Sequence, residues 1–100
     1  MSGFPVQFTK QAEDDLISIW RYIANESPQA ADRVLDRINS RCQGLAAHPY
    51  SGPPREEIAA GVRHLAIDGY LTLYRVRNEQ VEILRVLHGA RNIDDINVPD

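Results

Sequence analysis

The chain has 100 residues, of which 43% are hydrophobic and 25% are charged. A chain of this length can build only one core, so we expect a single domain over residues 1–100. Its apolar runs are far shorter than the roughly 20 residues that cross a bilayer, and residues 1–8 lack the basic and apolar stretches of an export signal. The sequence therefore predicts a cytoplasmic protein without a membrane partner.

The net charge of −3 conceals an uneven distribution of charge. Residues 61–93 carry five arginines and three acidic residues, and ten of the eleven basic residues in the chain are arginines. The planar guanidinium group pairs well with carboxylates and phosphates. We expect the positive charge to mark a place where a partner is bound.

The first half of the chain predicts a short strand and two helices. Residues 4–8 alternate between apolar and other side chains, with Pro5 at the strand start or edge. Thr9 is a candidate N-cap for a helix that ends near Asn25. Apolar residues recur along this helix at helical spacing: Ala12, Leu16, Ile19, Trp20 and Ile23.

A second helix is predicted directly after the first. Ser27 followed by Pro28 combines a capping hydroxyl with a proline at the first helical position. The apolar stripe of this helix includes Cys42 and continues to about Ala47. Because the connection is so short, the two helices should form an antiparallel hairpin.

The second half of the chain predicts a three-stranded meander. Residues 48–54 (HPYSGPP) form a loop by composition, and residues 56–61 are a candidate helical turn. Strands are expected over residues 62–67, 70–76 and 81–87, with the Asp68-Gly69 dipeptide at a tight hairpin turn. The fold class is α+β, with the helical hairpin on one face of a mainly antiparallel sheet.

Strict alternation predicts which side chains share a face of this sheet. In the middle strand one face carries Tyr70, Thr72, Tyr74 and Val76, and the other face carries Leu71, Leu73, Arg75 and Arg77. In the last strand one face carries Val81, Ile83, Arg85 and Leu87, and the other face carries Glu82, Leu84, Val86 and His88. Both faces are partly apolar, and a single helical hairpin covers only one. We expect the second face to be open to a partner; the alternative is that residues 48–61 or the C-terminal tail cover it.

Several kinds of chemistry are disfavoured by the residues present. The three histidines do not have metal-ligand spacing, Cys42 lies on an apolar stripe, and no glycine-rich phosphate loop is present. We therefore expect no metal and no cofactor. A metal-free ribonuclease remains possible, because RNA cleavage through the 2′-hydroxyl requires only an acid, a base and cations. The available groups are Tyr74, Arg75, Arg85, His88 and Arg91.

Nearly the whole chain, from about Phe8 to Ile93, resembles the ParE branch of the RelE/ParE superfamily of toxins from type II toxin–antitoxin modules. The resemblance is carried by Asp15-Leu16 with residues 22–24 (YIA), Ser27-Pro28, His48-Pro49 before Gly52, residues 61–63 (GVR), residues 74–76 (YRV) and residues 88–91 (HGAR). It implies a helical hairpin against a mainly antiparallel sheet. It also implies a bacterial toxin that a ParD-like antitoxin holds inactive by wrapping its C-terminal segment across it.

The resemblance leaves the cellular target open between branches of the superfamily. RelE-like members cut mRNA on the ribosome with lysines and arginines around the sheet, whereas ParE-like members typically act on DNA gyrase. Here only Arg75 matches a RelE-like position, no predicted strand carries a lysine, and no tyrosine follows Tyr74. We therefore interpret the chain as a non-enzymatic inhibitor of DNA gyrase that does not bind DNA by itself. The alternatives are a RelE-type ribonuclease and a degenerate, non-toxic antitoxin-binding module.

These interpretations assign roles to particular residues. We expect Arg63, Tyr74, Arg75 and Arg85 to bind the antitoxin, with the arginines pairing with carboxylates. We expect His88, Arg91, Ile93 and Ile96 to contact the target, because ParE-like toxins resemble one another up to Arg91 and diverge afterwards. If the protein were a ribonuclease, Arg75, His88 and Arg91 would be the catalytic candidates.

Overall fold

The computed structural model describes residues 3–89 and 96–99 of the chain. Two helices and a 3₁₀ turn pack on a four-stranded sheet with the strand order β1-β4-β3-β2. β1 is parallel to β4, and the other neighbours are antiparallel. The elements are β1 (Val6–Phe8), α1 (Lys10–Ala24), α2 (Pro28–Gln43), the 3₁₀ turn (Gly44–Ala46), β2 (Val62–Ile67), β3 (Tyr70–Arg77) and β4 (Gln80–His88).

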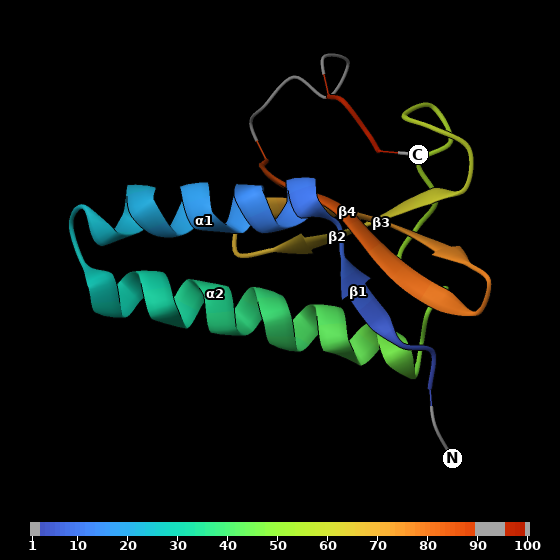
Figure 1. Ribbon diagram of the computed structural model, residues 1–100, viewed down its shortest axis with the longest axis horizontal. Coiled ribbons are helices and arrows are strands. Elements are labelled where there is room, and N and C mark those ends of the chain that lie inside the picture. Colours follow the sequence, from blue (N-terminus) through green and yellow to red (C-terminus); the bar gives the residue numbers. More distant parts are fainter. Residues whose placement is uncertain (1–2, 90–95, 100) are drawn as a thin grey trace.

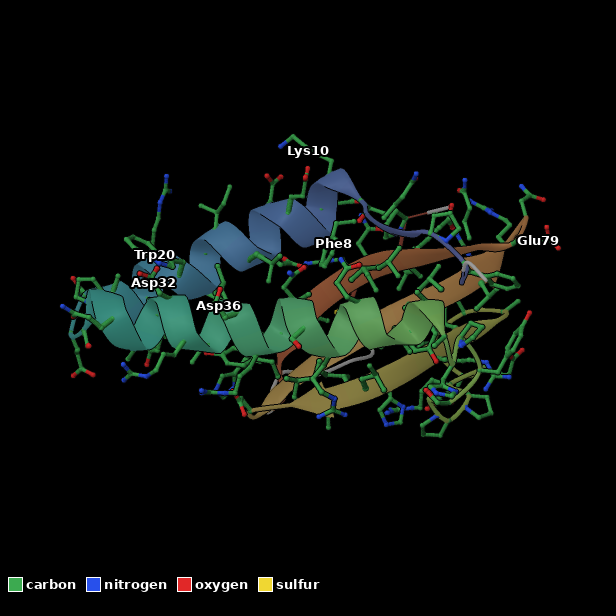
Figure 2. All side chains as sticks on the ribbon, turned by 90° about the horizontal axis from the view of Figure 1, so that it is seen from below. Phe8, Lys10, Trp20, Asp32, Asp36 and Glu79 are labelled. Carbon is green, nitrogen blue, oxygen red and sulfur yellow. The ribbon has the colours of Figure 1, made fainter. Side chains whose placement is uncertain are left out.

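The predicted helix starts are confirmed by their capping hydrogen bonds. The Thr9 hydroxyl accepts from the backbone N–H of Ala12 at 3.1 Å, and the Ser27 hydroxyl accepts from that of Ala30 at 3.2 Å. Figure 1 shows α1 and α2 running side by side as an antiparallel hairpin. The Trp20 indole N–H donates to Asp32 at 2.8 Å and links the helices, and Figure 2 shows the two side chains together between them.

The helical hairpin covers one face of the sheet, as predicted. Ile19 of α1 and Ile38 of α2 belong to the same core cluster as Tyr74 of β3 and Ile83 of β4. Cys42 is fully buried in this core. No helix in residues 3–89 and 96–99 is long and apolar enough to cross a membrane.

Both hairpin turns of the meander have two central residues with positive φ angles. Asp68 and Gly69 have φ angles of 51° and 81°, and Asn78 and Glu79 have φ angles of 54° and 59°. Positive φ at both central residues matches the right-handed twist of the flanking strands. Residues 56–61 form turns rather than the helical turn that was predicted, and the second α-helix ends at Gln43.

Strict alternation along the last strand is wrong, because β4 contains a bulge. Leu73 lies opposite Arg85 while the next residue, Tyr74, lies opposite Ile83, so Leu84 is an extra residue. One extra residue exchanges the two faces of the strand beyond it. Val86 therefore packs in the helix-side core with Ile83, and Leu87 packs with Leu84 on the second face, the reverse of the predicted arrangement.

Candidate functional site

The second face of the sheet is covered by the chain itself. Val62, Leu73, Leu84 and Leu87 form a buried cluster there, with relative exposures of 3% or less. Ile58 and Ala59 of the loop before β2 pack against this cluster, and so do Ile96 and Val98 near the C-terminus. The expectation of a face open to a partner is therefore wrong, and the alternative that the loop and the tail cover it is confirmed. We call residues 96–99 the strap.

Arg85 lies at the junction of α1, β4 and the strap. Its Nε and Nη2 donate to the two carboxylate oxygens of Asp15 at 2.7 and 3.0 Å, and its Nη1 donates to the carbonyl of Asn97 at 2.7 Å. The hydrogen bonds to Asp15 raise the pKa of Arg85 further above its ordinary value. Only 13% of the Arg85 side chain and 15% of that of Asp15 are exposed, so the charges of this pair are largely satisfied within the chain.

Arg75 and Arg77 share one carboxylate on the neighbouring strand. Glu82 lies 3.5 Å from Arg75 Nη2 and 3.2 Å from Arg77 Nη2. Arg75 Nη2 also donates to the carbonyl of Pro99 in the strap at 3.4 Å. Like Arg85, Arg75 therefore has its carboxylate partner inside the chain, whereas the sequence predicted a carboxylate of the antitoxin.

Arg63 and Tyr74 hold the proline-rich loop against the sheet. Arg63 Nη1 donates to the carbonyls of Tyr50 and Gly52 at 3.2 and 2.8 Å, and its guanidinium lies 5.2 Å from the centre of the Tyr50 ring. The Tyr74 hydroxyl accepts from the backbone N–H of Gly52 at 2.9 Å. Tyr74 is fully buried and so offers no surface to a partner in this conformation; its predicted role in antitoxin binding stays a prediction.

An apolar groove lies between α1 and the adjoining ends of β3 and β4. It has a volume of about 390 Å³ and is lined by Ser18, Ile19, Tyr22, Tyr70 and His88. The rings of Tyr70 and His88 meet edge to face with their centres 5.7 Å apart. Burial, with a smaller contribution from Tyr22, raises the pKa of Tyr70 above its ordinary value.

One large aromatic side chain of α1, Tyr22, is exposed at this groove. Tyr22 is 78% exposed; Ile17, elsewhere on the same helix, is 49% exposed. We call the residues that line the groove, Tyr22 included, the α1 surface. Among the described residues no group of histidine, cysteine and acidic side chains could hold a metal ion.

Comparison with known proteins identifies the family of the chain. The family model described as the ParE toxin of the parDE type II toxin–antitoxin system matches residues 6–93. The chain belongs to the ParE toxin family. This places it among the toxins of type II toxin–antitoxin systems and confirms the resemblance seen in the sequence.

Relatives of this ParE-family toxin carry names from both branches of the superfamily. Toxin ParE1 of Caulobacter vibrioides is 36% identical over 90 residues, covering 88% of this chain and 92% of the relative. Toxin RelE3 of the same organism is 34% identical over 87 residues, covering 83% of this chain and 91% of the relative. Sequence similarity alone therefore leaves the target undecided.

Solved structures confirm the α+β fold of the ParE-family chain. A chain from the chromosomal ParDE system of P. aeruginosa superposes with a TM-score of 0.73 at 24% identity, covering 85% of this chain and 95% of that one. A chain from the toxin–antitoxin complex RelBE2 of Mycobacterium tuberculosis superposes with a TM-score of 0.62 at 27% identity, covering 86% of this chain and 98% of that one.

The residues predicted to contact the target of the ParE-family toxin do not gather in one place. His88 lines the groove, whereas Ile96 packs in the strap against the second face. Arg91 and Ile93 lie outside the described residues. Sequence reasoning missed the α1 surface, although a signal was present: Tyr22 is a large aromatic residue that does not belong to the stripe predicted for the first helix.

Proposed function

We propose that this ParE-family toxin is held inactive by a ParD-like antitoxin and arrests growth by inhibiting DNA gyrase, without catalysing a reaction. The inhibitor forms contacts with its target and needs no acid, base or free cation of its own. We also propose that it acts in the cytoplasm, where the antitoxin and gyrase are accessible.

The observation that supports a non-enzymatic toxin is the state of the arginines on the sheet. Arg75 and Arg77 lie within ion-pair distance of Glu82, and Arg85 donates two hydrogen bonds to Asp15. Arg63 donates to two loop carbonyls. RNA cleavage needs cations that stabilise negative charge developing on phosphate, and a cation already held by a carboxylate is poorly suited to that work.

The antitoxin is proposed to dock on the α1 surface rather than on the second face of the sheet. Tyr22 supplies exposed apolar area, and the adjoining groove can take an apolar side chain of a partner helix or strand. A few aromatic and aliphatic anchors usually carry most of the affinity of an interface. The arginines predicted to contact the antitoxin would then act indirectly, by fixing the sheet and the loop.

A ribosome-dependent ribonuclease is the second candidate function. It is favoured by the RelE-named relatives and by the exposed position of His88 at the end of β4. His88 could serve as acid or base, with Arg75 and Arg91 as the remaining candidates. A degenerate toxin that keeps only antitoxin binding is the third candidate.

The purified full-length protein separates these candidates in two assays. A gyrase inhibitor blocks ATP-dependent supercoiling of relaxed plasmid and leaves ribosome-bound message intact, as read by primer extension. Site-specific cuts in that message, lost in His88→Ala, would replace the proposal with the ribonuclease. Neither effect, together with normal growth after induction, would identify the degenerate module.

A further inference from the structure

Arg41, in the last turn of α2, differs from the arginines of the sheet because its charge has no partner in the described part of the chain. Arg75, Arg77 and Arg85 each lie within ion-pair distance of a carboxylate. On its own an exposed arginine says little, because most arginines lie at the surface of a protein. The surroundings of Arg41 decide whether it belongs to a site.

Arg41 lines a pocket between the end of α2, the proline-rich loop and β2. The pocket has a volume of about 260 Å³; its polar residues are Ser40, Arg41, His48 and Ser51, and Leu65 of β2 also lines it. The backbone N–H of Ser51 donates to the carbonyl of His48 at 3.2 Å, and this turn holds the two loop residues close together. His48 belongs to a motif that carries the family resemblance, and no other feature of the fold or the site accounts for it.

All the polar side chains of this pocket can donate hydrogen bonds. The guanidinium of Arg41 is a planar fork of donors, the imidazole of His48 and the two serine hydroxyls can each donate, and no acidic residue lines the pocket. The hydroxyls of Ser40 and Ser51 form no hydrogen bond with any other described residue. Free donors gathered around one positive charge are what an oxyanion requires.

The end of α2 opposes an anion only weakly. The carbonyl end of a helix carries roughly half a negative elementary charge, which by itself would repel an anion. Here the N–H of Gly44 donates to the carbonyl of Ser40, and the N–H of Ala47 donates to that of Gly44 at 3.3 Å. The full positive charge of Arg41 therefore outweighs the partial charge of the helix end.

The charges of α2 are separated between its two flanks. Figure 2 shows Asp32 and Asp36 on the flank that faces α1. Arg33, Arg37 and Arg41 recur every four residues and so share the other flank. An ion pair of Arg37 with the turn between β2 and β3 places this flank beside β2. The pocket thus lies at the end of a positive strip in a chain whose net charge is −3.

We propose that the pocket of Ser40, Arg41, His48 and Ser51 binds a phosphate group. The guanidinium fork pairs with two phosphate oxygens, and the remaining donors suit the others, whereas a carboxylate has too few oxygens to use all of them. Pockets for whole drug-sized ligands usually exceed roughly 300 Å³, so this pocket takes the phosphate group and leaves the rest of the ligand outside. The phosphate belongs either to a small phosphorylated molecule or to a nucleic-acid backbone.

The phosphate site is separate from the proposed antitoxin contact. It shares no lining residue with the α1 surface. A phosphorylated ligand and a partner on the α1 surface can therefore be bound at the same time. The inference does not depend on the proposed function, and each can fail without the other.

A titration of the full-length protein with inorganic phosphate, followed by nuclear magnetic resonance at constant ionic strength, tests the site. We expect saturable shifts of the Arg41 side-chain signal and of the Gly44 and Ser51 amide signals. Arg41→Gln should weaken phosphate binding at least about tenfold, because it removes charge-assisted hydrogen bonds. The absence of saturable shifts at these residues would overturn the inference.

Arg33→Gln is the matched control for Arg41→Gln. It removes the same charge from the same exposed flank, about 12 Å away along the helix axis. Phosphate affinity should stay within about twofold of wild type, because Arg33 does not line the pocket. Equal weakening by the two substitutions would show general attraction to the positive strip and would overturn the site.

Ser51→Ala and His48→Gln test whether the pocket, and not Arg41 alone, binds the phosphate. Both side chains are exposed, so both variants should fold, as urea titration checks. Each should weaken phosphate binding severalfold, because each removes or changes a donor. If neither substitution had an effect, Arg41 would be an ordinary surface charge and the pocket would be overturned as a site.

Three further ligands identify the chemistry that the pocket recognises. Succinate, a dianion without phosphate, should bind at least about tenfold more weakly than phosphate, and equal binding would overturn the assignment to phosphate. Adenosine monophosphate that binds more tightly than a short oligothymidylate supports a small phosphorylated ligand. The reverse order, with oligothymidylate binding also weakened by Arg33→Gln, supports a nucleic-acid backbone that continues from the pocket along α2.

Discussion

The carboxylate of Asp15 on α1 receives three hydrogen bonds from two consecutive residues of β4. Arg85 donates two of them, at 2.7 and 3.0 Å, and the backbone N–H of Val86 donates the third at 3.0 Å. These residues follow directly after the bulge at Leu84. Asp15 therefore fixes the strand where its register shifts, and it does so in one of the motifs that carry the family resemblance.

Asp15→Asn should destabilise the protein by about 3 kcal/mol, because it leaves the largely buried Arg85 guanidinium without its counter-charge. The free energy of unfolding from urea titration measures this effect. Asp14→Asn is the matched control: Asp14 pairs with Lys10 at 2.7 Å on an exposed helix face, so its loss should cost less than about 0.5 kcal/mol. Equal effects of the two substitutions would show that the Asp15–Arg85 pair does not stabilise the fold.

Gly52→Ala should destabilise the loop that Tyr74 and Arg63 hold. A Cβ atom at Gly52 would lie 2.4 Å from the carbonyl oxygen of His64 and 2.8 Å from the Tyr74 hydroxyl, and neither neighbour can move freely. We expect a loss of about 2 kcal/mol in the free energy of unfolding, within the range for overpacking.

Gly44→Ala provides the control for that substitution. Gly44 ends α2 with helical backbone angles, and a Cβ there would have no atom within 4 Å. The change should be neutral or stabilise by up to about 1 kcal/mol, because alanine restricts the unfolded chain. A stable Gly52→Ala protein with an unchanged loop would contradict the tight packing described here.

Local signals were sufficient to predict most of the fold. Thr9 and Ser27 cap their helices through hydroxyl groups close in sequence, and Asp68-Gly69 adopts the hairpin turn that its composition favours. The position of the bulge could not be predicted in this way, because it depends on which residues of β3 and β4 face each other. Alternation alone contains no information about an inserted residue such as Leu84.

The candidate sites were harder to predict because they depend on contacts between distant segments. The sequence showed that the second face of the sheet is apolar, and it named the loop and the tail as possible covers. It could not show that Ile96 and Val98 pack on that face, or that Arg85 donates hydrogen bonds to Asp15, which lies 70 positions earlier. The groove beside Tyr22 likewise arises only when β3, β4 and α1 come together.

Cys42 should be chemically inert in the folded protein. Burial raises the pKa of its thiol to about 12, so at pH 8 only about one molecule in ten thousand carries the reactive thiolate. Reaction with a disulfide reagent should therefore be limited by unfolding and should accelerate sharply in urea. Fast labelling without denaturant would contradict the buried position.

The raised pKa of the Cys42 thiol also predicts how this residue affects stability at alkaline pH. The unfolded thiol ionises near its ordinary pKa of about 8.5, whereas the folded thiol holds its proton to about pH 12. Above pH 8.5 the unfolded state binds fewer protons, so stability falls as the pH rises, by up to about 1.4 kcal/mol per pH unit. The difference in unfolding free energy between wild type and Cys42→Ala should shrink over this window. If the difference in unfolding free energy between wild type and Cys42→Ala stayed constant between pH 8 and pH 10.5, the prediction would be wrong.

Tyr22→Ala should separate antitoxin binding from folding. The side chain is 78% exposed, so its removal should change the free energy of unfolding by no more than about 0.5 kcal/mol. As an aromatic anchor at the rim of the groove, it should nevertheless contribute strongly to the interface, and its loss should weaken antitoxin binding by at least about tenfold. Tyr50→Ala is the matched control, because Tyr50 is 60% exposed but lies on the loop and contacts Arg63. Binding that weakens in Tyr50→Ala and not in Tyr22→Ala would move the antitoxin from the α1 surface to the loop.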